Sequence, residues 1–161
     1  MAILIKVIRH SDGGLQYLRN MCNYICDGRE IAGGGYGLNP YDPGAAYLQM
    51  AAARSFYDQE DSNPLVHFVI SFDGKTDSAE FAAKAAPQIA AYFRDWYQVL
   101  WCIHPADQGS SHYHMHLLLH SVNLLNGKLY HSGPYEVNGF CYHVKSITGM
   151  PYRLVYEKNQ G

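Results

Sequence analysis

The sequence predicts an α+β fold in which helices cover a mostly antiparallel β-sheet. Short segments rich in β-branched and aromatic residues recur along the chain, and segments with helical spacing of apolar residues lie between them. Hydrophobic residues make up 48% of the 161 residues, which is enough to build one buried core. We therefore expect one α+β layer in a single domain that spans residues 1–161.

The expected strands have either an alternating pattern or a short apolar run. They are residues 2–8, 64–72, 97–104, 112–122 and 152–157, and the last is expected at an edge of the sheet. The dipeptide Asn126-Gly127 is typical of a hairpin turn. We therefore expect the chain to return along the preceding strand after this turn.

The first expected helix, residues 14–26, places Leu15, Leu18, Cys22 and Ile25 on one stripe. The other expected helices are residues 44–57, a segment that starts at Asp77 or Ser78 and runs to about residue 95, and residues 134–147. Pro87 must kink or split the third of these, because proline removes a helical hydrogen bond. Residues 27–44 hold six glycines and two prolines, which predicts a turn-rich loop or a small hairpin.

Composition and charge exclude several classes of protein. The net charge of −2 excludes the strongly basic surface of a DNA-coating protein. We find no secretory signal and no apolar stretch long enough to span a bilayer, so we expect a cytoplasmic protein without a membrane partner. The four cysteines form no CxxC pair, and we expect them to be buried free thiols.

Histidines are concentrated between His104 and His120. In a strand, His112, His114 and His116 point to one side, and His120 continues the row. Such a row is costly inside a core, because each imidazole needs a hydrogen-bond partner, whereas neutral imidazoles bind divalent metals well. If the strands before and after residues 105–111 are neighbours, His104 can join the row as a further ligand.

Three neutral histidines would leave a metal its full charge and open positions. Such a site suits an anionic phosphate, whose P–O bond the metal polarises. A structural zinc site is less well matched, since those sites are closed and usually contain cysteine. Cleavage of a phosphodiester would then need a nucleophile, which can be metal-bound water or a tyrosine side chain.

The segment from His104 through HYHMHLLLHSVN at 112–123 resembles the metal motif of MobA/VirD2-like mobilization relaxases of plasmids and integrative elements. Gly127-Lys128 also falls in register with that motif, although His120 stands where the family usually has Asn and Asp107 is shifted by a longer loop. PLVHFVISF at 64–72 is similar to the family's His-Phe-x-x-Ser-Phe strand. Asn23-Tyr24-Ile25 is similar to the segment with the catalytic tyrosine, but CDGREI follows it in place of Asn-Pro-x-Lys-Thr.

The resemblance implies an RRM-like palm related to the HUH endonucleases, expected as a five-stranded, mostly antiparallel sheet with helices packed on one face. It implies that His104, His114 and His116 hold one Mg²⁺ or Mn²⁺. Tyr24, with Tyr17 in reserve, would attack single-stranded DNA at an origin of transfer and form a 5′-phosphotyrosyl enzyme. His112 or Asp107 would orient a ligand or take the tyrosine proton, and other relaxosome proteins would be partners.

Contacts with DNA must come from local patches, because the chain is slightly acidic overall. Candidates for binding DNA are Lys6, Arg9, Arg19, Arg29, Lys128 and Asn123. Acidic residues, among them Asp73 and Asp77, are expected away from the histidine face. Two alternatives stay open beside the strand transferase, namely a metal phosphodiesterase that uses water and a catalytically weak DNA-binding accessory or replication-origin module.

Overall fold

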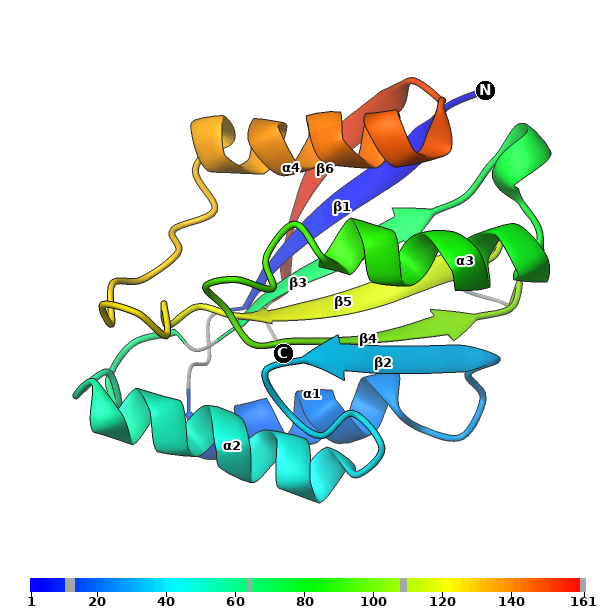
Figure 1. Cartoon of the computed structure of the whole chain (residues 1–161). Helices are drawn as coiled ribbons and strands as arrows, with labels where there is room; N and C mark the ends of the chain where they lie inside the picture. Colours follow the sequence, from blue (N-terminus) through cyan, green and yellow to red (C-terminus); the bar gives the residue numbers. More distant parts are fainter. Residues whose placement is uncertain (11–13, 64, 108–109, 160–161) are drawn as a thin grey trace.

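The computed structural model describes residues 1–10, 14–63, 65–107 and 110–159. Within these residues the elements follow one another in this order: β1 (Ile3–His10), α1 (Leu15–Ile25), β2 (Ala32–Tyr36), α2 (Pro43–Phe56), β3 (Leu65–Ser71), the short 3₁₀ helix η1 (Gly74–Thr76), α3 (Ala79–Ala90), β4 (Val99–His104), β5 (His114–His120), α4 (Pro134–Thr148) and β6 (Tyr152–Asn159). Figure 1 shows this arrangement. None of the described helices is long and apolar enough to cross a membrane.

The strands form one sheet in the order β2-β4-β5-β3-β1-β6. Neighbouring strands are antiparallel except for β1 and β6, which run parallel. The predicted α+β class and the mostly antiparallel sheet are confirmed, and β6 is the expected edge strand. The described sheet has six strands, however, whereas the family resemblance implied five.

The additional strand is β2, whose sequence AGGGY lies in the segment predicted as a loop or small hairpin. Glycine is a poor strand former, so the pattern hid this strand. The structure shows why glycines are needed there: a Cβ at Gly34 would lie 2.4 Å from the ring of Trp101, and a Cβ at Gly35 would lie 2.8 Å from the carbonyl oxygen of Val99. The edge strand β2 can therefore pair with β4 only because its central residues are glycines, which have no side chains.

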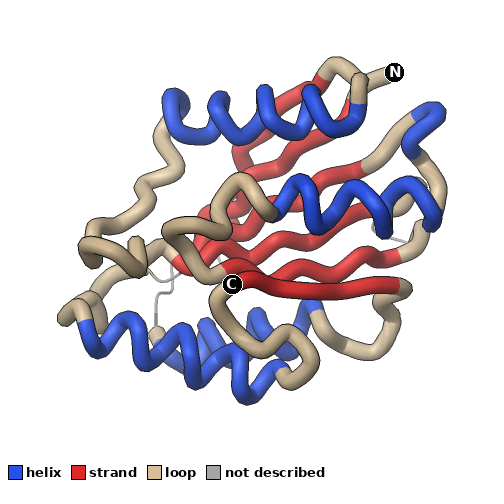
Figure 2. The backbone as a smooth tube through the Cα atoms, in the orientation of Figure 1, coloured by secondary structure: helices blue, strands red, loops and turns tan. Residues whose placement is uncertain are grey.

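Helices cover both faces of the sheet, as Figures 1 and 2 show, and not one face as expected. One apolar cluster joins α3 and α4 to Trp101, Ile103, Leu117 and other residues of the sheet. A second cluster joins α1 and α2 to residues on the opposite face, including Leu100 and Leu118. Because side chains alternate along a strand, β4 and β5 are apolar on both sides and need cover on both.

The helix α1 packs with a stripe that differs from the predicted one. Leu18, Cys22 and Ile25 are fully buried, but Leu15 in the first turn is 47% exposed and Tyr17 takes its place in the core at 7%. Among the other helices, Ser78 and not Asp77 caps α3, and its hydroxyl accepts a hydrogen bond from the Phe81 amide. The helix α3 ends at Ala90, three residues after Pro87, and so stops short of residue 95.

The helices α1 and α2 pack against β4 and β5 and leave the same face open over β3, β1 and β6. Leu4, Lys6, Val69, Ser71 and Arg153 come from these three strands and line a cavity on this open face. The uncovered face of β3, β1 and β6 forms the floor of this cavity, and this floor extends away from the C-terminal end of α1. The candidate functional site lies where this floor meets the helix.

Candidate active site

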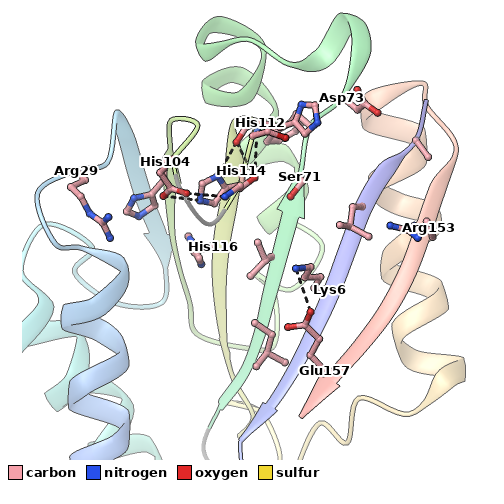
Figure 3. A pocket seen from close by; sticks show the side chains of 18 of the residues that line it. Lys6, Arg29, Ser71, Asp73, His104, His112, His114, His116, Arg153 and Glu157 are labelled. Carbon is pink, nitrogen blue, oxygen red and sulfur yellow. Dashed lines mark hydrogen bonds and ion pairs between the residues drawn. The ribbon is translucent and has the colours of Figure 1, made fainter. Parts of the chain in front are cut away.

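A cavity of about 570 Å³ opens between the end of α1, the loop after β4 and the uncovered part of the sheet. Figure 3 shows it from close by, with His104, His114 and His116 on one side and Lys6, Arg153 and Glu157 on the other. The lining therefore combines imidazoles with both cations and carboxylates. It is large enough for a ligand of nucleotide size.

The three predicted metal ligands lie side by side because of the register of β4 and β5. His104 pairs directly with His114, as expected if the two strands are neighbours, and His116 follows two residues later on the same face. The ring centroids of His104, His114 and His116 lie 5.0–5.8 Å apart. All three side chains are buried, with exposed fractions of 4–9%.

Each of these rings is oriented by a hydrogen bond at one of its nitrogens. His104 Nε2 donates to the carbonyl oxygen of Ile25 at 3.0 Å, and His114 Nδ1 donates to the carbonyl oxygen of His112 at 2.9 Å. His116 Nδ1 lies 2.9 Å from Nε2 of His67 on β3. In a neutral imidazole the nitrogen that does not donate carries a lone pair, so these bonds leave Nδ1 of His104 and Nε2 of His114 able to accept a cation.

Burial keeps His116 neutral, since it lowers the pKa of this imidazole to about 2, and the neighbouring histidines add to the effect. A neutral ring is the form that binds metal. Among the described residues, the group whose ligand atoms lie close enough together to share a metal is Asp27, Glu30 and His104, with one atom of each within 4.8 Å of the others; it contains one of the three predicted histidines. A divalent cation that accepts nitrogen and oxygen ligands fits this group, whereas His104, His114 and His116 do not by themselves form a group of ligand atoms at that distance.

Tyr24 lies in the last turn of α1 and lines the same cavity. Its side chain is 51% exposed, and its ring centroid lies 5.8 Å from that of His116. The bond from His104 to the carbonyl oxygen of Ile25 fastens this helix end to β4. Tyr17, the reserve candidate, is buried under α2 and does not line the cavity, because two turns of helix move it about 10 Å along the axis.

His112 and Asp107 both line the cavity, although neither belongs to a strand. His112 Nδ1 lies 2.8 Å from Oδ2 of Asp77, and this hydrogen bond raises the pKa of the imidazole. Asp107 Oδ2 lies 3.9 Å from His114 Nε2. The placement of Asp77, and of Asp73 in the cavity wall, contradicts the expectation that these acids lie away from the histidines.

His120 continues the row of histidines as predicted but not into the cavity. It is fully buried at the far end of β5, near Arg54 of α2. The face of β5 that is open at His114 and His116 is covered by α1 and α2 at Leu118 and beyond. The strand alternation is the same along β5, and only the covering helices decide which histidines line the cavity.

Among the proposed DNA contacts, Arg29 lines the cavity and pairs with Asp27 at 2.5 Å. The other proposed contacts in the predicted set, Arg9, Arg19, Lys128 and Asn123, do not line it. Arg9 donates to the carbonyl oxygen of Ser132 and lies over the ring of Tyr156. Asn123 accepts a hydrogen bond from the Leu125 amide in a turn. Lys6, which was also a predicted contact, lines the floor together with Arg153, which was not, and the sequence could not place their strands side by side.

Sequence reasoning missed three features of the site. His67, which orients His116, could have been noticed in the His-Phe pair of β3. Asp27 and Glu30 follow Tyr24 closely but gave no pattern. The thiols were expected to be buried, yet Cys26 is half-buried and its Sγ lies 3.3 Å from Sγ of Cys102. The four thiols are free, as predicted.

The comparison with known families agrees with this geometry. The family model for the MobA/VirD2-like relaxase nuclease domain matches residues 17–139, which include Tyr24, His67 and the three clustered histidines. No curated protein matches the chain. The matched segment ends within α4. Because it spans most of the chain, this protein belongs to the MobA/VirD2-like relaxase family and carries its nuclease domain.

Proposed function

We propose that this relaxase domain cleaves single-stranded DNA at an origin of transfer through Tyr24 with the help of one divalent metal, and so initiates conjugative transfer. The observation that carries the proposal is the shared cavity: the hydroxyl-bearing ring of Tyr24 lies beside His116, and the three histidine rings converge next to it. The family supplies the general activity of a DNA-nicking relaxase. The roles of the individual residues are our proposal.

His104, His114 and His116 would hold Mg²⁺ or Mn²⁺, with Asp27 and Glu30 near enough to contribute oxygen ligands. Bound there, the cation supplies positive charge against the non-bridging oxygens of a phosphate. His67 would position His116, because the hydrogen bond between the two imidazoles sets the orientation of the His116 ring.

In the chemical step, Tyr24 Oη forms a bond to phosphorus while the bond from phosphorus to the 3′-oxygen breaks. The tyrosine proton passes to a base, for which Asp107 and His112 are the candidates in the cavity. The departing 3′-oxygen takes a proton from water or from the base that has just been protonated and becomes a free 3′-OH. The phosphotyrosyl ester keeps the energy of the phosphodiester, so attack by a 3′-OH can reverse the step.

The open floor gives the DNA strand a place to lie on either side of the scissile phosphate. Lys6 and Arg153 project from β1 and β6 toward the cavity, as Figure 3 shows, and Arg29 stands at its other side. Lys6 is paired with Glu157 at 3.3 Å, so a phosphate must compete with a carboxylate for it. We therefore propose modest, salt-sensitive binding in which the metal contributes much of the positive charge.

The test is covalent capture from a pool of 3′-labelled single strands of random sequence in the presence of Mn²⁺. We expect an adduct that survives denaturation and whose sequenced DNA reveals a common nick site. Tyr24→Phe should form no adduct, whereas Tyr17→Phe, a matched loss of one hydroxyl from the same helix, should form it unless the buried position affects folding. Circular dichroism of both variants checks the fold.

The other outcomes separate the alternatives. Cleavage of the enriched strands without an adduct would show a phosphodiesterase that uses water. Enrichment of strands without any cleavage would show a binding module. An adduct that persists in Tyr24→Phe would assign the nucleophile to another residue, and an adduct that forms equally well in His114→Ala with a chelator would remove the metal from the proposal.

A further inference from the structure

A second groove lies on the opposite side of the sheet from the active site. It runs between the segment that follows α3 and the first turns of α4 and has a volume of about 550 Å³. Its walls consist mainly of aromatic rings, from Tyr92, Trp96, Tyr97, Tyr130, Tyr135 and Tyr142, and we call it the tyrosine groove. The proposed DNA chemistry uses none of these residues.

Two features form the groove: Gly139 has no side chain, and one face of α4 is exposed. Tyr135 and Tyr142 are seven residues apart on α4, so they project from the same side of the helix, with exposed fractions of 94% and 64%. Gly139 lies between them, and a Cβ there would come within 2.7 Å of the hydroxyl oxygen of Tyr92. The glycine thus lets Tyr92 close one wall against α4, while Trp96, at 47% exposure, forms part of the wall opposite the helix.

One carboxylate stands among these rings. Glu136 lines the groove and raises the pKa of Tyr92, Tyr97 and Tyr130, in each case after the larger effect of burial. No lysine, arginine or histidine of the described residues forms an ion pair with Glu136. One of its oxygens accepts only a long hydrogen bond, 3.4 Å, from the Gly133 amide. The groove therefore has one negative charge without a cationic partner in the part of the chain that the structure describes.

A polar atom without a hydrogen-bond partner among the described residues lies beside this carboxylate in the lining of the groove. The hydroxyl oxygen of Tyr130 is buried and forms no hydrogen bond with the described residues, although the side chain lines the groove. A buried hydroxyl without a partner costs free energy that a bound donor or acceptor can recover. Together with Glu136 it favours a ligand that brings hydrogen-bond donors and positive charge.

We propose that the tyrosine groove binds an arginine side chain presented by a peptide segment of a partner protein. A guanidinium is planar, so it can stack on Tyr or Trp faces while it donates to a carboxylate and to a tyrosine oxygen. Nucleic acid fits this groove poorly, because a phosphate would be repelled by Glu136. A purely apolar ligand fits poorly too, because it would leave the carboxylate and the Tyr130 hydroxyl without partners.

The experiment uses the whole chain, labelled with ¹⁵N, and capped pentapeptides with a central arginine or glutamine. The indole N–H signal of Trp96, assigned with Trp96→Phe, reports on the groove, whereas that of Trp101, buried in the core, is the internal reference. We expect the arginine peptide to shift the Trp96 signal and the glutamine peptide to leave it unchanged. Glu136→Gln should weaken binding about tenfold, because it removes the ion pair.

Glutamine at position 136 keeps an oxygen for the Gly133 amide, so α4 should begin as before. Glu80→Gln, on the exposed first turn of α3, is the matched control and should bind the arginine peptide like the wild type. Equal affinity of Glu136→Gln and wild type, or equal binding of the glutamine peptide, would overturn the proposal. A short single-stranded oligonucleotide that shifts the Trp96 signal instead of the peptide would overturn it in favour of a DNA-binding surface. DNA cleavage should be unchanged in Glu136→Gln, so this test does not depend on the proposed nickase function.

Discussion

His120 gives a sharp test of how burial affects this fold, because it is a fully buried histidine outside the active-site cavity. Neither of its ring nitrogens has a hydrogen-bond partner among the described residues. Burial lowers the pKa of this imidazole to about 3, and the nearby Arg54 guanidinium adds to the effect. The replacement we consider is His120→Leu, which keeps a similar volume and removes both nitrogens.

The magnitude follows from the two pKa values. The unfolded chain takes up a proton on His120 below its ordinary pKa near 6.5, whereas the folded chain does so only near 3. Stability contributed by the neutral ring is therefore complete above pH 6.5 and is lost as the pH falls through the window between these values. From pH 8 to pH 5 the loss amounts to about 2 kcal/mol. Removal of two unpaired nitrogens should also add about 1 kcal/mol at pH 8.

Urea unfolding at pH 8, 6.5 and 5, followed by circular dichroism, measures both effects. We expect His120→Leu to be more stable than the wild type at every pH and to lose about 2 kcal/mol less between pH 8 and pH 5. His131→Gln replaces an exposed histidine and should follow the wild-type curve. If His120→Leu and the wild type lose the same free energy on acidification, the buried neutral histidine does not exist in solution and the reasoning fails.

Three further predictions concern the site and the core. His67→Phe should lower Mn²⁺ affinity about 10- to 100-fold in calorimetry, because His116 loses its orienting partner, and unchanged affinity would refute that role. Phe140→Ala should cost about 3–5 kcal/mol in urea unfolding, since the ring is fully buried between α4 and the sheet, and a cost below about 1 kcal/mol would contradict the packing. Cys26 should react with iodoacetamide before Cys141, as measured by peptide mapping. A hydrogen bond lowers the pKa of the half-buried Cys26 thiol, whereas burial raises the pKa of the Cys141 thiol to about 11. The reverse order of reaction would contradict this arrangement.

Local patterns in the sequence were enough to predict the main sheet and the histidine row. The alternation in HYHMHLLLH predicts that His114 and His116 share a face, and this is confirmed because it depends only on strand geometry with period two. The pairing of β4 with β5, which the sequence offered only as a condition, brings His104 beside them. The helices α1, α2 and α4 were found for the same reason, since their spacing of apolar residues is local.

Features that depend on which surfaces meet were decided only by the tertiary structure. The strand β2 has three glycines at its centre, and it exists because these glycines let its backbone approach Trp101 and Val99. The helices needed on both faces follow from the two apolar sides of β4 and β5, which the prediction of one covered face did not take into account.

The same division holds within the site. By itself the sequence indicated histidines as candidate metal ligands, but not Asp27 and Glu30, because imidazole chemistry and strand alternation are properties of the local chain. Only the fold decided that Tyr24 reaches the cavity and Tyr17 does not, that His120 is covered, and that Lys6 and Arg153 lie on one floor. These outcomes depend on contacts between segments far apart in sequence, such as the parallel pairing of β1 with β6, and no local pattern encodes the end point of such a contact.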